Sequence, residues 1–203
     1  MFQISSGRLI TTRYHHAIIK FYTNRSMGYR YYLQADHDVQ LSQHLPYNLL
    51  ELMATNGHQM AGSSELVHDY QEVLDGLAEL TRFWLQISKF TPVSSFYRHF
   101  NSNENSFRNL DSENWDREIS PGYFQVVDLR LWFSESVQDF LRTVLRSGRD
   151  IEGRWSEQGV FNMVRQLFVE DSAFLQVEGV RHPATTCEQS VVTMDGTIEQ
   201  QLF

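Results

Sequence analysis

The segment Tyr29-Arg-Tyr-Tyr-Leu-Gln-Ala-Asp-His-Asp-Val-Gln40 is an aromatic, β-prone stretch that ends in two acids, Asp36 and Asp38. Side chains two residues apart on a strand point the same way, so both carboxylates can address one point in space. Their mutual repulsion would be relieved by a divalent cation such as Mg²⁺ or Mn²⁺, which prefers hard oxygen ligands. The Asp-x-Asp pattern therefore predicts a metal–diphosphate site, and a solvated turn after a strand is the alternative.

The composition limits the classes of protein to consider. The 203 residues are enough for one domain with a sizeable core, and the net charge of −8 argues against a general nucleic-acid binder. The single cysteine, Cys187, excludes an internal disulfide. No apolar run reaches the about eighteen residues that a membrane span needs, and the first residues do not resemble a signal peptide. These features predict a soluble globular protein.

Helical and extended patterns alternate along the chain. Apolar spacing, Pro46 and Gly57 predict helices at 13–22, 46–56, 69–89, 131–146 and 157–170. Strands are expected at 29–35, 59–67, 122–128 and 174–177, and a polar loop between about 100 and 120. Strands interleaved with helices predict an α/β fold, organised as one domain over 1–187 followed by a frayed polar tail over 188–203.

Three further segments carry candidate functional groups. Glu157 opens a helix, where the helix dipole favours its ionised form, although a first-turn acid is often only a cap. His182, in the loop Gly179-Val-Arg-His-Pro183, could be a third metal ligand beside the aspartates or simply a solvated side chain. Gln125 lies mid-strand, and Asp128, at the end of the same strand, is either a helix cap or a working acid.

These blocks, in this order, resemble glycosyltransferase family 15, the fungal α-1,2-mannosyltransferases that use GDP-mannose in the Golgi. The family segment Tyr-Arg-Tyr-Tyr-Trp-Arg-Val-Glu-Pro-Asp-Val-Lys corresponds to 29–40, and Asn-Phe-Glu-Ile-Ala-Asp to 123–128. Its Glu-Arg-Trp-Gly-Asp and Tyr-Arg-His-Pro motifs correspond to 153–157 and 180–183. The resemblance covers roughly 14–187 and implies a GT-A-like, Rossmann-related mixed β-sheet flanked by helices. The patterns around Gln125 and Glu157 are also similar to those of other GT-A enzymes, such as the glycogenin-like family.

The resemblance also implies roles for individual residues. Asp36 and His182 would bind Mn²⁺, and Asp38 would contact the metal through water or the donor ribose. Tyr14 would help to hold the nucleotide, and Glu157 would take a proton from the acceptor or orient its hydroxyl.

Two arginines lie in the matching blocks. Arg154 and Arg181 are candidate phosphate contacts, and each could equally be a structural partner of an acid.

The chain departs from the family at Gln125, where the family has a Glu proposed as the nucleophile. An amide cannot form the covalent glycosyl intermediate that a carboxylate can. The interpretation we favour is front-face attack assisted by the leaving diphosphate, with Gln125 steadying the sugar. Glu157 or Asp128 could instead replace the nucleophile, or activity could be lost. Because residues 33–35 also differ, mannose specificity does not carry over directly.

The leading hypothesis is a metal-dependent retaining glycosyltransferase that moves a sugar, with mannose implied, from a nucleotide-sugar to a glycan or glycoprotein acceptor. The alternatives are a silent GT-A-like domain that binds a sugar nucleotide or glycan or scaffolds a partner, and a purely structural α/β protein. Only some thirty-five residues precede Asp36, so an N-terminally truncated or compact form is expected. The resemblance implies the Golgi lumen, and without an anchor or signal the cytoplasm remains open.

Overall fold

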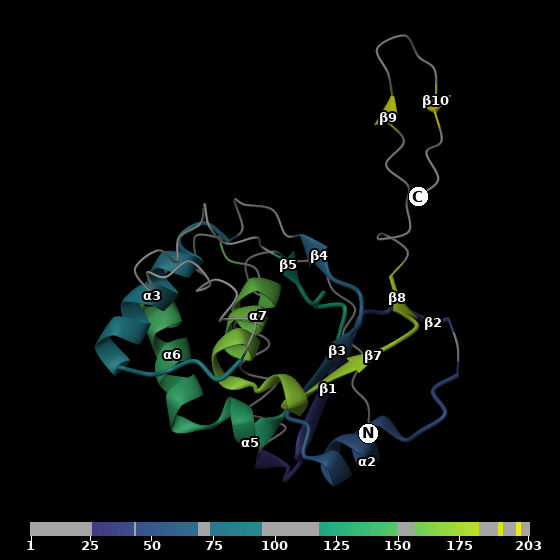
Figure 1. Cartoon of the computed structure of the whole chain (residues 1–203), viewed down its shortest axis with the longest axis horizontal. Coiled ribbons are helices and arrows are strands. Elements are labelled where there is room, and N and C mark those ends of the chain that lie inside the picture. The colour runs from purple at the N-terminus through teal and green to yellow at the C-terminus, as the bar shows by residue number, and fades with distance from the viewer. Residues whose placement is uncertain are drawn as a thin grey trace.

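A four-stranded mixed sheet, in the order β1-β6-β3-β7, forms the centre of the protein (Figure 1). The computed structural model describes residues 26–42, 44–68, 74–94, 118–149, 155, 157–182, 191–192 and 198–199. The strands are β1 (Tyr31–Ala35), β3 (Met60–Ser63), β6 (Phe124–Asp128) and β7 (Phe174–Val177). β6 is antiparallel to β1 and β3, whereas β3 and β7 are parallel. This mixed sheet confirms the predicted α/β class.

Helices cover both faces of the sheet. One face packs against α3 (Leu77–Ser88), α5 (Leu129–Trp132), α6 (Glu135–Arg146) and α7 (Glu157–Phe168), and the other against α2 (Leu49–Asn56). The larger core centres on Trp84, whose ring lies 5.3 Å from that of Phe140 and 5.6 Å from that of Phe168. The described helices are all too short or too polar to span a bilayer.

Three short strand pairs lie outside the central sheet. They are β2 (Gln40–Leu41) with β8 (Val180–Arg181), β4 (Val67–His68) with β5 (Glu118–Ile119), and β9 (Val191–Val192) with β10 (Ile198–Glu199). The β9–β10 pair lies in the tail that we expected to be frayed. The β2–β8 pair joins the two segments that carry the predicted metal ligands.

The observed boundaries correct several predictions. The expected strand over 59–67 is divided into β3 and β4, and the expected helix over 131–146 is interrupted where α5 ends at Trp132 and α6 begins at Glu135. The interruption arises because Ser134 is extended (φ −63°, ψ 150°) and is the N-cap of a new helix.

Two helix predictions have different outcomes. Within the described residues, the helix expected over 69–89 begins at Leu77, because Gly76 precedes it with a φ of 80° in the left-handed region; residues 69–73 lie outside the described part. The helix expected at 13–22 lies outside the described residues, as does the polar loop as far as residue 117.

Candidate functional site

Asp36, Asp38 and His182 converge just beyond the end of β1. One potential ligand atom from each side chain lies within 4.8 Å of the other two. The Nε2 atom of His182 is 3.0 Å from Oδ1 of Asp38, and the three side chains are partly buried. The structure therefore brings together the three residues that the sequence analysis nominated as metal ligands.

Backbone hydrogen bonds hold both sides of this cluster in place. The Asp36 N–H donates to the carbonyl of Tyr123 (2.8 Å), and the Asp36 carbonyl accepts from Val39 N–H (3.2 Å) in the following turn. The β2–β8 pair then sets Gln40 opposite Arg181, the residue before His182. The Asp-x-Asp turn and the histidine are thus fixed against each other by main-chain contacts.

The chemistry of the cluster fits a divalent cation. Two carboxylates supply the hard oxygen atoms that Mg²⁺ and Mn²⁺ prefer, and an imidazole nitrogen is also acceptable to Mn²⁺. His37 adds a second imidazole, with Nδ1 3.9 Å from the same Asp38 oxygen, but its side chain is 69% exposed. Asp36, Asp38 and His182 are therefore a group of described residues that could hold a divalent cation.

A hydrogen-bonded group that the sequence analysis missed lies beside His182. The ring of Tyr123 stacks on the imidazole, with centroids 5.3 Å apart and planes at 27°. Its hydroxyl donates to Glu65 Oε2 (3.0 Å) and lies 3.3 Å from Ser63 Oγ. Burial raises the pKa of Tyr123. The hydrogen bond with Ser63 lowers this pKa, and the Glu65 carboxylate raises it further. The only available signal was the position of Tyr123 two residues before Gln125.

The structure describes one of the two arginines that were predicted to contact phosphate. Arg181 projects an exposed side chain whose Nε lies 3.8 Å from Glu65 Oε1, so an acid partner is present in the structure. A mostly exposed pair of this length contributes little to stability, which leaves the guanidinium able to exchange partners. Tyr14 and Arg154 lie outside the described residues.

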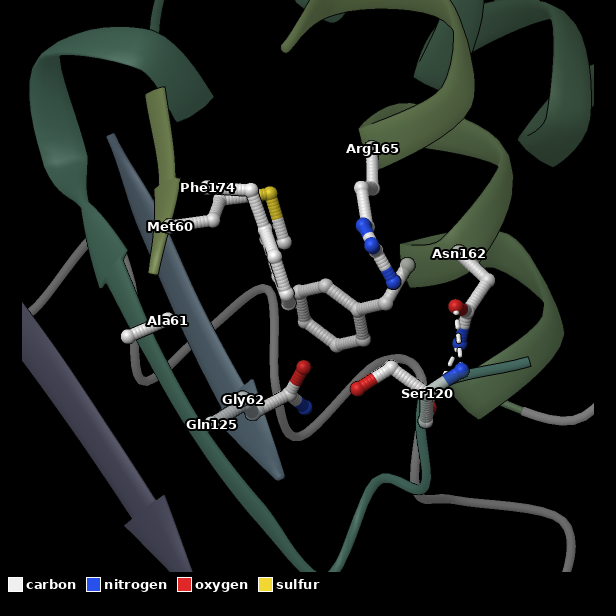
Figure 2. A pocket seen from close by; sticks show the side chains of 9 residues that line it. Met60, Ala61, Gly62, Ser120, Gln125, Asn162, Arg165 and Phe174 are labelled. Carbon is white, nitrogen blue, oxygen red and sulfur yellow. Dashed lines mark hydrogen bonds between the residues drawn. The ribbon is translucent and has the colours of Figure 1, made fainter. Parts of the chain in front are cut away.

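Gln125 faces a small pocket between the sheet and α7 (Figure 2). The free volume of the pocket is about 10 Å³, which is room for a single water molecule. Its walls come from β3, β6, β7 and α7 with Ser120, and the lining residues are Met60, Ala61, Gly62, Ser120, Gln125, Phe161, Asn162, Arg165 and Phe174. Gln125 is buried, and its Nε2 has no hydrogen-bond partner among the described residues.

Glu157 lies on the same side of the sheet as Gln125. It opens α7, and its negative charge, after burial, helps to raise the pKa of Tyr32 to about 12. Tyr32 shares a strand face with Gln34, which is paired directly with Gln125 across the β1–β6 ladder. Because Asp36 follows Gln34 by two residues and its N–H continues the pairing with β6 at Tyr123, strand alternation directs Asp36 to the face of the sheet that carries Gln125.

Two polar side chains of α7 line the same pocket. The guanidinium of Arg165 lies 3.5 Å from the centre of the Phe174 ring, and burial lowers the Arg165 pKa to about 10, with Asp171 opposing the shift. Asn162 accepts from Ser120 N–H (2.8 Å) and donates to the Ser120 carbonyl (2.8 Å), as the dashed lines in Figure 2 show. Neither residue was singled out by the sequence analysis.

Asp128 is a helix cap and not a second acid of this pocket. Its carboxylate accepts from the backbone N–H of Arg130 (2.9 Å) and from the side chains of Arg130 (2.7 Å) and Arg30 (3.1 Å). Burial alone would raise its pKa, but these hydrogen bonds outweigh burial and lower it. Strand alternation puts Asp128 on the opposite face of β6 from Gln125. The suggestion that Asp128 replaces the missing nucleophile is therefore wrong.

Comparison with solved structures gives the same fold in fungal enzymes. Core-mannan synthase A (CmsA/Ktr4) from Aspergillus fumigatus, in an Mn/GDP form, matches with a TM-score of 0.64 at 15% identity, over 76% of this chain and 42% of that chain. The mannosyltransferase Ktr4p from S. cerevisiae in complex with GDP matches with a TM-score of 0.63 at 16% identity, over 82% of this chain and 40% of that one. The chain thus spans about two fifths of the length of these proteins.

A protein-family model matches nearly the whole chain. No curated protein sequence matches it significantly. The family model described as glycolipid 2-alpha-mannosyltransferase matches residues 4–197, which confirms the resemblance to glycosyltransferase family 15. Together with the mixed sheet and its flanking helices, this match shows that the chain belongs to the glycolipid 2-alpha-mannosyltransferase family.

Proposed function

We propose that this chain carries the donor and metal site of a manganese-dependent retaining mannosyltransferase, with a nucleotide-sugar, GDP-mannose, as donor. The observation that carries the proposal is the convergence of Asp36, Asp38 and His182 within 4.8 Å in a member of this family. The forms in which the similar structures were solved, with Mn and GDP or with GDP, support the choice of ligands. The proposed acceptor is a hydroxyl of a glycan or glycoprotein.

Each residue of the site has a proposed task. Asp36 and His182 would hold the cation, and Asp38 would hold it directly, through water, or bind the donor ribose. A cation held there would supply positive charge next to the nucleoside diphosphate leaving group. Arg181 can leave its long contact with Glu65 to bind a phosphate oxygen. Tyr14 and Arg154 stay proposed donor contacts.

Glu157 is the proposed group that orients the acceptor hydroxyl or takes its proton. Its place in the first turn of α7 keeps the carboxylate ionised, because the helix N-terminus is positive. The neighbouring Tyr32, with a pKa of about 12, stays protonated at neutral pH and adds no competing base. A carboxylate at this place can accept a hydrogen bond from an acceptor hydroxyl or take its proton.

Gln125 favours front-face transfer over a covalent intermediate. Its amide is a poor nucleophile, but it can stabilise a positive sugar carbon with its oxygen or donate its buried Nε2 to a sugar hydroxyl. The small pocket that Gln125 lines has room for a hydroxyl group or a water molecule. On this proposal, Q125A lowers kcat while mass spectrometry finds no glycosyl-enzyme in wild type.

The test measures GDP release from GDP-mannose with Mn²⁺ and α-mannoside acceptors. H182A and D36N should lose turnover, whereas H44A, which changes an exposed histidine, should retain it. Stabilisation by Mn²⁺ plus GDP without turnover of any donor would identify a silent binding domain. If Mn²⁺ plus GDP does not stabilise the protein at all, the result would favour a purely structural α/β protein.

The family resemblance also leads us to propose the Golgi lumen as the location. Protease protection of a tagged gene product in isolated Golgi vesicles tests this. Digestion of the tag in intact vesicles would contradict it.

A further inference from the structure

Tyr123 makes a face-to-face contact with the histidine of the proposed metal site. The two rings are 27° from parallel with centroids 5.3 Å apart, and the His182 side chain is only 18% exposed. A ring that lies against one face of an imidazole limits its rotation to orientations within that plane. The Nε2 atom, which lies in the plane, then faces Asp38 Oδ1 at 3.0 Å.

Tyr123 is itself fixed at both ends. Its carbonyl accepts from Asp36 N–H (2.8 Å), so its backbone is tied to the residue that supplies another proposed ligand. At the far end of the ring, the hydroxyl donates to Glu65 Oε2 (3.0 Å), which is the shorter of its two polar contacts. The ring therefore has little freedom to tilt away from His182.

The strand that carries His182 is tied to the same group. Ser63 Oγ donates to the carbonyl of Val180 (3.2 Å) and accepts from Glu65 N–H (3.1 Å). Ser63 and Tyr123 are both buried, so the hydrogen bond from Ser63 to Val180 is shielded from water, whereas the Glu65 side chain is 40% exposed. The position of β8, the tilt of the Tyr123 ring and the orientation of the imidazole thus depend on one connected set of contacts.

We propose that Tyr123 is a positioning residue for His182: it holds the imidazole plane so that Nε2 faces the two aspartates before any ion binds, and Glu65 and Ser63 hold Tyr123. This inference rests on the metal site of the proposed function. Holding a ligand in its binding orientation removes part of the ordering cost of binding. Groups that orient a metal-binding histidine commonly change metal affinity by about 10–100-fold.

The experiment compares wild type with Y123L, which removes the stacked ring, Y123F, which removes only the hydroxyl, and the matched control Y47L at an exposed tyrosine. In metal-free protein, NMR of the imidazole protons reports the ring current of Tyr123, with H182Q assigning the signals. Mn²⁺ affinity is measured from the EPR signal of free Mn²⁺. We expect Y123L to shift the His182 signals and weaken Mn²⁺ binding about tenfold. Y123F should weaken it about threefold, and Y47L should change neither measurement.

The two readouts separate this inference from the proposed function. If wild type binds Mn²⁺, H182A does not, and Y123L binds like wild type, the positioning role is overturned while the metal site stands. If wild type does not bind Mn²⁺, the proposed function fails, and the metal-free NMR still decides whether Tyr123 orients the ring. Should Y123L fail to fold, unchanged His182 signals and Mn²⁺ affinity in Y123F overturn the inference, and the expected loss supports it.

Discussion

Replacing Asn162 with Ala should destabilise the protein strongly, because one side chain satisfies two buried backbone groups of Ser120. The Asn162 Oδ1 accepts from Ser120 N–H and Nδ2 donates to the Ser120 carbonyl, both at 2.8 Å. Asn162 is 5% exposed and Ser120 9% exposed, so water cannot readily take over these bonds. Leaving a buried polar group without a partner costs about 1–3 kcal/mol.

Two such groups, partly rehydrated through the space that Ala leaves, give an expected loss of about 3 kcal/mol in the free energy of unfolding. For a chain of this size, each kcal/mol lowers Tm by about 2–4 °C, so Tm should fall by about 6–12 °C. Urea unfolding followed by circular dichroism measures the free energy, and calorimetry measures Tm. The control is N56A, because Asn56 is exposed near the end of α2.

N162D provides the sharper comparison. An aspartate keeps the shape and the acceptor for Ser120 N–H, but it turns the donor toward the carbonyls of Ser120 and Gln158 into a second acceptor. At neutral pH it should therefore be at least as destabilising as Ala. Acid should narrow its gap to wild type, because the protonated carboxyl regains one donor. A loss below about 1 kcal/mol for N162A, or wild-type stability of N162D at pH 7, would refute the reasoning.

Three further substitutions test other contacts. D128N should cost about 2 kcal/mol at pH 7 by weakening the hydrogen bonds with Arg30 and Arg130. Since the folded Asp128 pKa lies below its usual 3.8, this contribution is present above pH 3.8 and is lost as pH falls through the folded pKa. The difference in the free energy of unfolding between wild type and D128N, measured with urea, should therefore shrink in acid. G62A should lower Tm, because a Cβ would meet Ser120 Oγ at 2.7 Å and Phe174 Cζ at 3.2 Å; an S120A background that fails to reduce the loss would count against this cause. N48A should cost about 1 kcal/mol in thermal unfolding by removing the α2 cap on Glu51 N–H (3.3 Å), and no loss would contradict that role.

Local sequence signals were sufficient for several elements. The strand expected at 174–177 is β7 to the residue, and the helix expected from 157 begins at Glu157, because each has a clear apolar pattern. Gly57 ends α2 with a φ of 74°, as its place after the helical pattern predicted. The break between α5 and α6 was not predicted, because it depends on the extended conformation of Ser134, which the apolar spacing does not register.

For the candidate site too, the sequence was sufficient to predict some features and not others. The convergence of Asp36, Asp38 and His182 could be anticipated because each lies in a motif of a recognised family. The contacts that hold these residues could not be predicted, because Glu65 lies in no motif and is 58 positions away from Tyr123 in the sequence. The bonds from Asn162 to Ser120 likewise join residues 42 positions apart. Long-range polar contacts of this kind leave no periodic signal in a single sequence.

The link between β3 and β8 has a consequence for how the protein folds. The hydrogen bond from Ser63 Oγ to Val180 closes a loop of 117 positions, and the β2–β8 pair brings the Asp-x-Asp turn to the same late segment. Contacts this distant are formed slowly, because chain entropy must be lost before they contribute. A nascent chain that has not yet released the segment around His182 therefore lacks the complete cluster. If the proposed Mn²⁺ site exists, its acquisition during refolding would report completion of the native topology, and not merely collapse of the core.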